Sequence, residues 1–139
     1  MQLLFGHDSI VLQWAGAKLQ THFPHGIGIG VVDAAGGLRG AFVLEPWNQY
    51  CAELNVYSEQ ALTRAVLRDF CRYVFDHLHL ARLQAHTERN NKSVKRGLPK
   101  IGCKWDGVAK NWYRPQRDGL RFYLTPADCK WIEQHGQQT

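Results

Sequence analysis

The chain has 139 residues, of which 45% are apolar, and a formal net charge of +5 at pH 7. This apolar content is too high for a disordered chain, and the length predicts one domain over residues 1–139. No apolar run approaches the roughly 20 residues that a membrane-spanning helix needs, so we expect no membrane protein.

The first residues lack a basic stretch followed by an apolar one, so we expect no secretion signal and a cytoplasmic location. The four cysteines contain no Cys-x-x-Cys pair, and in a cytoplasmic protein they are expected to be free thiols. No set of side chains has metal-ligand spacing, so no metal site is expected. The excess of Lys and Arg favours anionic partners, such as phosphates, an acidic cofactor or nucleic acid.

The first third of the chain predicts a strand at 2–5, a helix at 8–19 and a hairpin formed by 26–33 and 38–44. Gly26, Gly28 and Gly30 superficially resemble a dinucleotide-binding fingerprint. That fingerprint needs a strand before it and a helix after it, whereas these glycines lie inside a strand of the hairpin. We therefore reject a dinucleotide site.

The middle of the chain predicts a strand at 50–57, a turn at 58–60 and a long amphipathic helix at 61–79. Alternation along the strand puts Leu54 and Val56 on one face and Glu53 and Asn55 on the other. A strand that leads into the N-terminus of a helix can hold a phosphorylated ligand, because free N–H groups and the helix dipole point to one place.

The last part predicts a strand at 81–87 and a helix that starts near Ser93 and is irregular around Gly97 and Pro99. Two strands at 103–109 and 120–124 follow, joined by a loop at 111–119. A short final helix is expected over 125–133.

This order of elements resembles the GNAT acetyltransferase superfamily, a fold of the α/β (α+β) class with a mixed, mostly antiparallel sheet and a long central helix. The most specific part of the resemblance is Asn90-x-x-Ser93, followed by Lys100-Ile-Gly102 and Asp106-Gly107. The chain is most similar to small, N-terminally shortened members of viral or prophage type that resemble ribosomal-protein N-terminal acetyltransferases. Cys103 and Asp106 stand where the family usually has Phe and Glu.

The resemblance implies an acetyl-CoA-dependent N-acetyltransferase that acts on a primary amine, which could be a protein N-terminus, a lysine or a small amine. The residues that would bind acetyl-CoA are Leu54, Asn55, Val56, Ala61, Leu62, Thr63, Arg64, Asn90 and Ser93. The family's glycine-rich pyrophosphate loop is absent between Ser58 and Arg64. The hydroxyl of Thr63 and the guanidinium of Arg64 could replace the lost backbone contacts.

Three residues are candidates for two roles in acid–base chemistry. Glu53 stands where many family members keep a carboxylate and could take the proton of the amine. The family's usual tyrosine acid is absent, so Tyr113, or else Tyr123, is the candidate donor to the leaving thiolate. For each of these residues an ordinary structural role also stays open.

Other functions stay open as well. The chain could be a catalytically inactive GNAT-fold protein that binds CoA or has a structural role, because the loop glycines and the usual tyrosine are missing. A nucleic-acid-binding module ranks lowest, although basic residues between 89 and 104 lie close in sequence to Trp105 and Trp112. The acceptor is undetermined, and the oligomeric state is open, with a homodimer as one option.

Overall fold

The computed structural model describes residues 1–132, apart from the side chains of Ser93 and Arg96. Its centre is a seven-stranded sheet with the order β1-β2-β3-β4-β5-β7-β6. All neighbouring strands are antiparallel except β4 and β5, which are parallel. The strands are β1 (Gln2–Leu4), β2 (Ile27–Val32), β3 (Leu38–Pro46), β4 (Cys51–Ser58), β5 (Arg82–Glu88), β6 (Lys104–Arg114) and β7 (Arg117–Leu124). This mixed, mostly antiparallel sheet confirms the predicted fold class.

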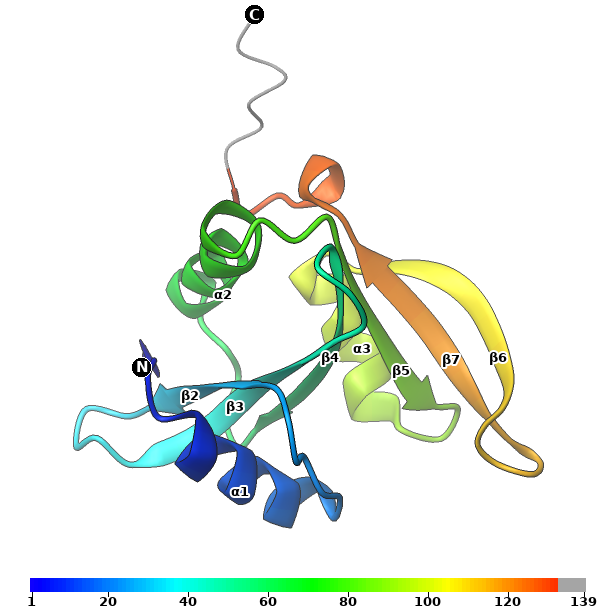
Figure 1. Ribbon diagram of the computed structural model, residues 1–139, viewed down its shortest axis with the longest axis horizontal. Coiled ribbons are helices and arrows are strands. Elements are labelled where there is room, and N and C mark those ends of the chain that lie inside the picture. Colours follow the sequence, from blue (N-terminus) through cyan, green and yellow to red (C-terminus); the bar gives the residue numbers. More distant parts are fainter. Residues whose placement is uncertain (133–139) are drawn as a thin grey trace, which may run out of the picture.

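The helices cover both faces of the sheet (Figure 1). Helix α1 (Asp8–Leu19) packs on one face through Val11 and Ala15, against Ala41 and Val43 of β3. Helices α2 (Arg64–Arg72) and α3 (Lys92–Ile101) pack on the other face. There the rings of Phe42 and Phe70 stack with centroids 4.0 Å apart. Because side chains alternate along β3, successive residues of this strand pack against α1 on one face of the sheet and against α2 and α3 on the other.

Strands β4 and β5 pair over only three positions, Cys51 with Arg82, Ala52 with Leu83 and Glu53 with Gln84. Both strands then continue, to Ser58 and to Glu88, without pairing further. Figure 1 shows the consequence, a sheet whose two halves spread apart between β4 and β5. This divergence is the feature that positions the candidate site.

The predicted helix at 61–79 is too long at both ends. Helix α2 begins at Arg64 because Thr63 is its N-cap, with the Thr63 hydroxyl accepting a hydrogen bond from the N–H of Val66 at 3.2 Å. Ala61 and Leu62 lie in the connection that precedes it. After Arg72 the chain continues as a π-helical turn, η1 (Tyr73–His77).

The interruption expected at Gly97 and Pro99 is also wrong. Helix α3 is continuous to Ile101, with Pro99 inside it. It ends at Gly102, whose φ of 113° lies in the region that favours glycine, and whose N–H bonds to the carbonyls of Leu98 and Pro99. The capping glycine, and not the proline, therefore stops this helix.

The predicted loop at 111–119 is the end of a hairpin. Strands β6 and β7 run on to Arg114 and Arg117, with a tight turn at 115–116. Side chains hold this end together, because Asp118 accepts from the N–H of Asn111 at 2.9 Å and Asn111 accepts from the N–H of Gln116 at 2.8 Å. Of the predicted final helix only a single turn is seen, η2 (Pro126–Asp128), and Glu133 lies outside the described residues.

No helix within residues 1–132 is long and apolar enough to cross a membrane.

Candidate functional site

The divergence of β4 and β5 leaves one edge of each strand without a strand partner in the described structure. On β4 this edge belongs to residues 54–58, and on β5 to residues 85–88. Such an edge presents backbone N–H and C=O groups that can accept an added extended chain. The predicted cofactor-binding residues Leu54, Asn55 and Val56 all lie along it, with Leu54 buried and Val56 packed against the core.

Glu53 lies at the point where the strands separate, on the face of the sheet that carries α1. Tyr57 lies four residues after Glu53 on the same strand, so their side chains share a face of the sheet. The ring of Tyr57 contacts that of Trp14 in α1, which identifies this face. The Glu53 carboxylate contacts β5 through both oxygens. Its Oε2 lies 2.8 Å from Nδ1 of His86, and its Oε1 accepts from the Gln84 amide at 3.3 Å.

A second carboxylate lies beside Glu53. Glu45 is directly opposite it in the antiparallel register of β3 and β4. The Asn55 side-chain amide donates to Oε1 of Glu45 at 2.9 Å, so this side chain is engaged while its backbone stays at the strand edge. Among the described residues, no Lys or Arg forms an ion pair with either carboxylate. The site is therefore locally acidic in a chain whose net charge is +5.

The start of α2 offers backbone donors on the other side of the divergence. The N–H groups of Val66 and Leu67 bond to Thr63, whereas those of Arg64 and Ala65 have no partner in the described structure. The Thr63 hydroxyl oxygen serves as the cap, so the predicted phosphate contact of this hydroxyl competes with capping. Arg64 is exposed at the first position of the helix.

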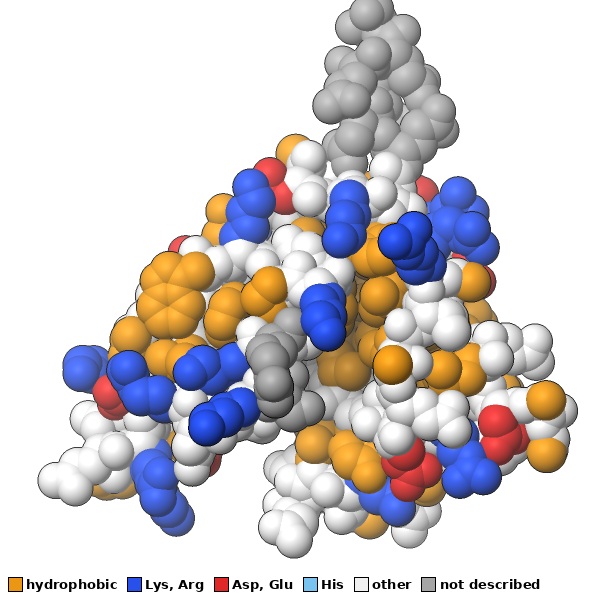
Figure 2. All heavy atoms as spheres, turned by 180° about the vertical axis from the view of Figure 1, so that it is seen from behind, with side chains coloured by type: hydrophobic (Ala, Val, Ile, Leu, Met, Phe, Trp, Pro, Cys, Tyr) orange, Lys and Arg blue, Asp and Glu red, His pale blue; other side chains and the backbone are white. Residues whose placement is uncertain are grey.

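Ala61 is exposed and Leu62 half-buried in the segment before the helix. Figure 2, seen from behind, shows Lys and Arg side chains beside a hollow lined by hydrophobic side chains, on the face that carries α3. This arrangement suits an anionic ligand with an apolar arm.

The start of α3 differs in detail from the prediction. Asn91, and not Asn90, caps the helix by accepting from the N–H of Val94 at 3.3 Å. Asn90 is exposed in the preceding turn and lines a hollow of about 340 Å³ together with Glu88 and Arg117. The backbone of Ser93 lies in the first turn of α3, and its side chain is outside the described part of the structure.

The end of the β6–β7 hairpin brings aromatic residues to Glu53. The Trp112 ring stacks on the His86 ring with centroids 3.7 Å apart and an interplanar angle of 7°. Burial, and then the charges of Glu88 and Glu53, raise the pKa of Tyr113 to about 12. Tyr113 and Glu53, the two predicted catalytic residues, are thus brought within electrostatic reach of each other.

Tyr123, the other candidate acid, has a different environment. The Arg82 guanidinium lies over its ring, 5.0 Å from the centroid. Arg82 and Arg121 also bind the Asp106 carboxylate, at 2.7 and 3.1 Å, and hold the pKa of Asp106 below its ordinary value. These contacts tie β5, β6 and β7 together and indicate a structural role for Tyr123.

His86 is a site residue that sequence analysis missed. Its side chain is only 2% exposed and that of Glu53 12%. Alternation along β5 puts His86 on the same face as Gln84, which is a signal readable in the sequence. The contact with Glu53 depends on the parallel register of two strands separated by a helix, which residue spacing does not reveal.

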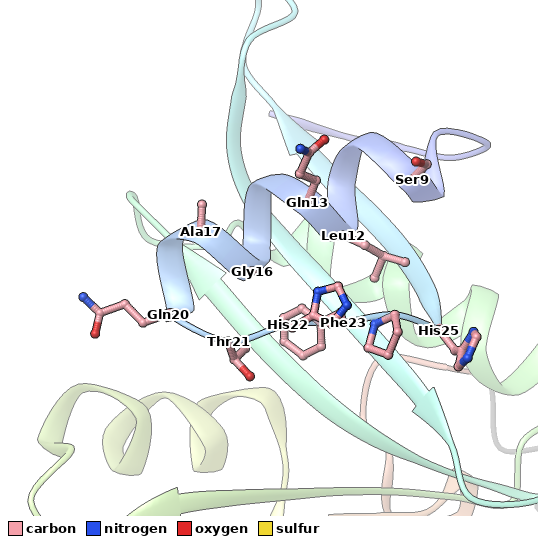
Figure 3. A pocket seen from close by; sticks show the side chains of 12 residues that line it. Ser9, Leu12, Gln13, Gly16, Ala17, Gln20, Thr21, His22, Phe23 and His25 are labelled. Carbon is pink, nitrogen blue, oxygen red and sulfur yellow. The ribbon is translucent and has the colours of Figure 1, made fainter.

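A separate hollow of about 920 Å³ lies between α1 and the segment 20–26 (Figure 3). Its titratable side chains are His22 and His25, both exposed, and no carboxylate lines it. It offers no acid–base pair comparable to that at Glu53. Within residues 1–132, no three His, Cys, Asp or Glu side chains are placed to hold a metal ion.

Comparisons with known proteins place the fold. No family model matches the chain, and no curated protein matches it by sequence. Solved structures do match, and among them is an acetyltransferase of the GNAT family from Bacillus anthracis, with a TM-score of 0.59 and 17% identity over 70% of this chain and 65% of that one.

A putative ribosomal-protein-serine acetyltransferase from Vibrio cholerae matches with a TM-score of 0.64 and 21% identity, over 83% of this chain and 68% of that one. A dodecameric spermidine N-acetyltransferase from the same organism matches with a TM-score of 0.63 and 19% identity, over 84% of this chain and 73% of that one. The chain therefore has the fold of the GNAT acetyltransferases, as the sequence predicted.

Proposed function

We propose that this chain is an acetyl-CoA-dependent N-acetyltransferase that acetylates a primary amine. The observation that carries the proposal is the separation of β4 from β5 directly after Glu53 and Gln84. It combines an unpaired strand edge, a helix start with free N–H groups and a partly buried carboxylate in one region. The solved structures of the same fold are acetyltransferases, which supports this choice of chemistry.

The residues present fit acetyl-CoA. The free edge at 54–58 suits the amide groups of a pantetheine arm, which would bind as an added strand. The N–H groups of Arg64 and Ala65, with the Arg64 guanidinium, suit a pyrophosphate. We place Ala61, Leu62 and Thr63 beside the pyrophosphate, and Asn90 and Ser93 beside the arm.

When bound, acetyl-CoA supplies an acetyl group activated as a thioester. Glu53 then accepts the proton of the attacking amine at a carboxylate oxygen. Tyr113, whose pKa is raised to about 12, is protonated on Oη at neutral pH and can give that proton to the leaving thiolate. A backbone N–H at the edge of β4 polarises the carbonyl, an effect worth about 2–4 kcal/mol in other oxyanion sites.

The electrostatics favour a cationic acceptor. Like charges directly opposite each other on neighbouring strands are destabilising, which is the situation of Glu45 and Glu53. An approaching ammonium relieves this repulsion. Exposed aromatic rings lie close by, with Trp47 and Trp112 centroids 6.5 Å apart, and such rings attract cations. Polyamines, lysine side chains and protein N-termini all meet this description.

The test combines binding and turnover. Thermal unfolding is measured with acetyl-CoA and with CoA, and thiol release is then followed with spermidine, with a lysine peptide and with a peptide that has a free N-terminus. We expect stabilisation by both nucleotides and thiol release with at least one amine. Stabilisation without release would point to the inactive CoA-binding alternative, and the absence of both would overturn the proposal.

A further inference from the structure

The His86 ring is held on two sides. Its Nδ1 lies 2.8 Å from Oε2 of Glu53, and its face stacks on Trp112. An ionised carboxylate can only accept a hydrogen bond, so a neutral His86 must carry its proton on Nδ1. The ring is thus oriented by its own contacts toward the carboxylate that the proposed reaction uses.

The other nitrogen of His86 has nothing to bind in the described structure. Nε2 is buried and without a hydrogen-bond partner. A buried polar atom that lacks a partner costs free energy, and an apolar side chain would avoid that cost. The contact between Nδ1 and Glu53 is therefore the feature that explains why a histidine occupies this position.

Trp112 reaches His86 by lying across Gly119 of β7. A Cβ atom at Gly119 would lie 3.0 Å from both Cβ and Cγ of Trp112, so a larger residue would push the indole by a few tenths of an ångström. The register of β6 against β7 is irregular between Ala109 and Arg114, which allows this end of the hairpin to bend. The hairpin is therefore shaped to bring an aromatic face onto His86.

We propose that His86 is a positioning residue that orients the Glu53 carboxylate through the contact at Nδ1, and that Trp112 fixes His86 in this orientation. The inference rests on the proposed function. In the proton transfer, the ammonium loses a proton to Glu53, while the Nδ1 proton stays on His86 and stabilises the carboxylate before transfer. Other polar or charged groups surround Glu53 from four strands, its own included, namely Gln84, Glu88, Glu45, Asn55 and Tyr113. Of these groups, the amide of Gln84 donates a hydrogen bond to the Glu53 carboxylate. The Nδ1–H group of His86 is therefore the second donor to this carboxylate.

Three variants separate positioning from general packing. His86→Asn keeps an amide donor near the place of Nδ1, His86→Leu removes it, and Gly119→Ala displaces Trp112 without changing a polar group. We expect His86→Leu to lower kcat about 10- to 100-fold, since a general base contributes about 10²- to 10⁴-fold. The KM for acetyl-CoA should stay within about twofold, because the edge of β4 and the start of α2 are untouched.

Rescue by a conservative variant gives a readout that packing alone would not move, because only His86→Asn keeps a donor for the Glu53 carboxylate. His86→Asn should restore most of kcat, and Gly119→Ala should resemble a weaker His86→Leu. His22→Asn and Trp105→Phe, at exposed positions away from Glu53, serve as matched controls.

Nitrogen NMR of the histidine rings makes the test independent of turnover. The expected result is the Nδ1–H tautomer of His86, with ring protons shifted by the Trp112 face and this shift changed in Gly119→Ala. An Nε2–H tautomer would overturn the inference even in an inactive protein. In an active protein, His86→Leu with wild-type kcat, or His86→Asn as impaired as His86→Leu, would also overturn it. Wild-type protein without thiol release would overturn the proposed function instead.

Discussion

Glu53 and Gln84 are the last two residues to face each other across the parallel pair of β4 and β5, and the amide of Gln84 donates to the Glu53 carboxylate at 3.3 Å. The carboxylate therefore lies at the vertex from which the two strand edges separate. A ligand that enters between the strands must end beside it. The position of this one carboxylate links the fold to the proposed chemistry.

Replacing Glu53 by Gln tests its role as the base. The amide is nearly the same size but cannot take a proton, so we expect kcat to fall about 100-fold or more, with a small change in the KM for acetyl-CoA. Glu59→Gln is the control, because Glu59 forms only surface ion pairs with Lys18 and Arg39. Steady-state rates of thiol release measure both. A Glu53→Gln enzyme with near-wild-type kcat would remove Glu53 from the proton transfer.

Replacing Arg64 by Ala tests the phosphate contact at the start of α2. We expect the Kd for CoA to rise about tenfold, equal to about 1.4 kcal/mol, and its dependence on salt to weaken. Arg72→Ala, at the last position of the same helix, should leave the Kd unchanged. Calorimetric titration at two salt concentrations makes the comparison. Equal affinities of the two variants would place the phosphates elsewhere.

Replacing Tyr113 by Phe tests the proton donor. The pKa of Tyr113 is raised to about 12 by burial and by the neighbouring carboxylates, so the phenol stays protonated up to about pH 10. We expect Tyr113→Phe to lower kcat about tenfold at every pH from 6 to 10, without changing the shape of the profile. Tyr123→Phe is the matched control and should be near wild type. If Tyr113→Phe abolished an alkaline limb below pH 10, the phenol would ionise in that range, against this account.

Asp106 contributes to stability in a pH-dependent way. Hydrogen bonding to Arg82, with a further contribution from Arg121, lowers its pKa from the ordinary 3.8. Because the pKa is lower in the folded protein, the unfolded chain binds this proton at a higher pH than the folded protein does. The stabilisation by ionised Asp106 is therefore fully present above about pH 4 and is lost as the pH falls through the lowered pKa. We expect Asp106→Asn to reduce the free energy of unfolding at pH 7 by at most about 1 kcal/mol, because solvent screens these pairs.

Denaturant unfolding at pH 7 and at pH 2.5 measures this effect. The difference between Asp106→Asn and wild type should shrink at the lower pH. Asp69→Asn, at an exposed position with one weak ion pair, is the control. A difference that grows on acidification would contradict the assigned sign.

Local sequence patterns predicted much of the fold. Alternation along residues 50–57 put Leu54 and Glu53 on opposite faces of the strand, and the structure confirms this, with Leu54 buried in the core. Helix ends were harder. Leu62 continues the apolar spacing of α2, yet the chain needs residues 59–63 to leave β4, and the hydroxyl of Thr63 fixes the start. Spacing alone does not distinguish a helix position from a half-buried connection.

The site was predicted only in part, because its contacts join distant strands. Glu53 and Tyr113 were identified as candidates, but the residue that binds Glu53, His86, lies 33 positions along the chain on a parallel strand. Because residues 111–119 were predicted as a loop, the stacking of Trp112 on His86 was not expected. The turn residues in this segment do not reveal that Asn111 and Asp118 hold the end of a hairpin together. Register across a sheet decides such contacts, and it is not encoded in local spacing.

The most direct measurement is a crystal structure of the protein grown with acetyl-CoA. We expect the pantetheine arm along residues 54–58 of β4, the pyrophosphate at the N–H groups of Arg64 and Ala65, and the thioester beside Glu53. Acetyl-CoA bound away from the separation of β4 and β5, or a closed gap with the nucleotide absent at saturating concentration, would contradict it.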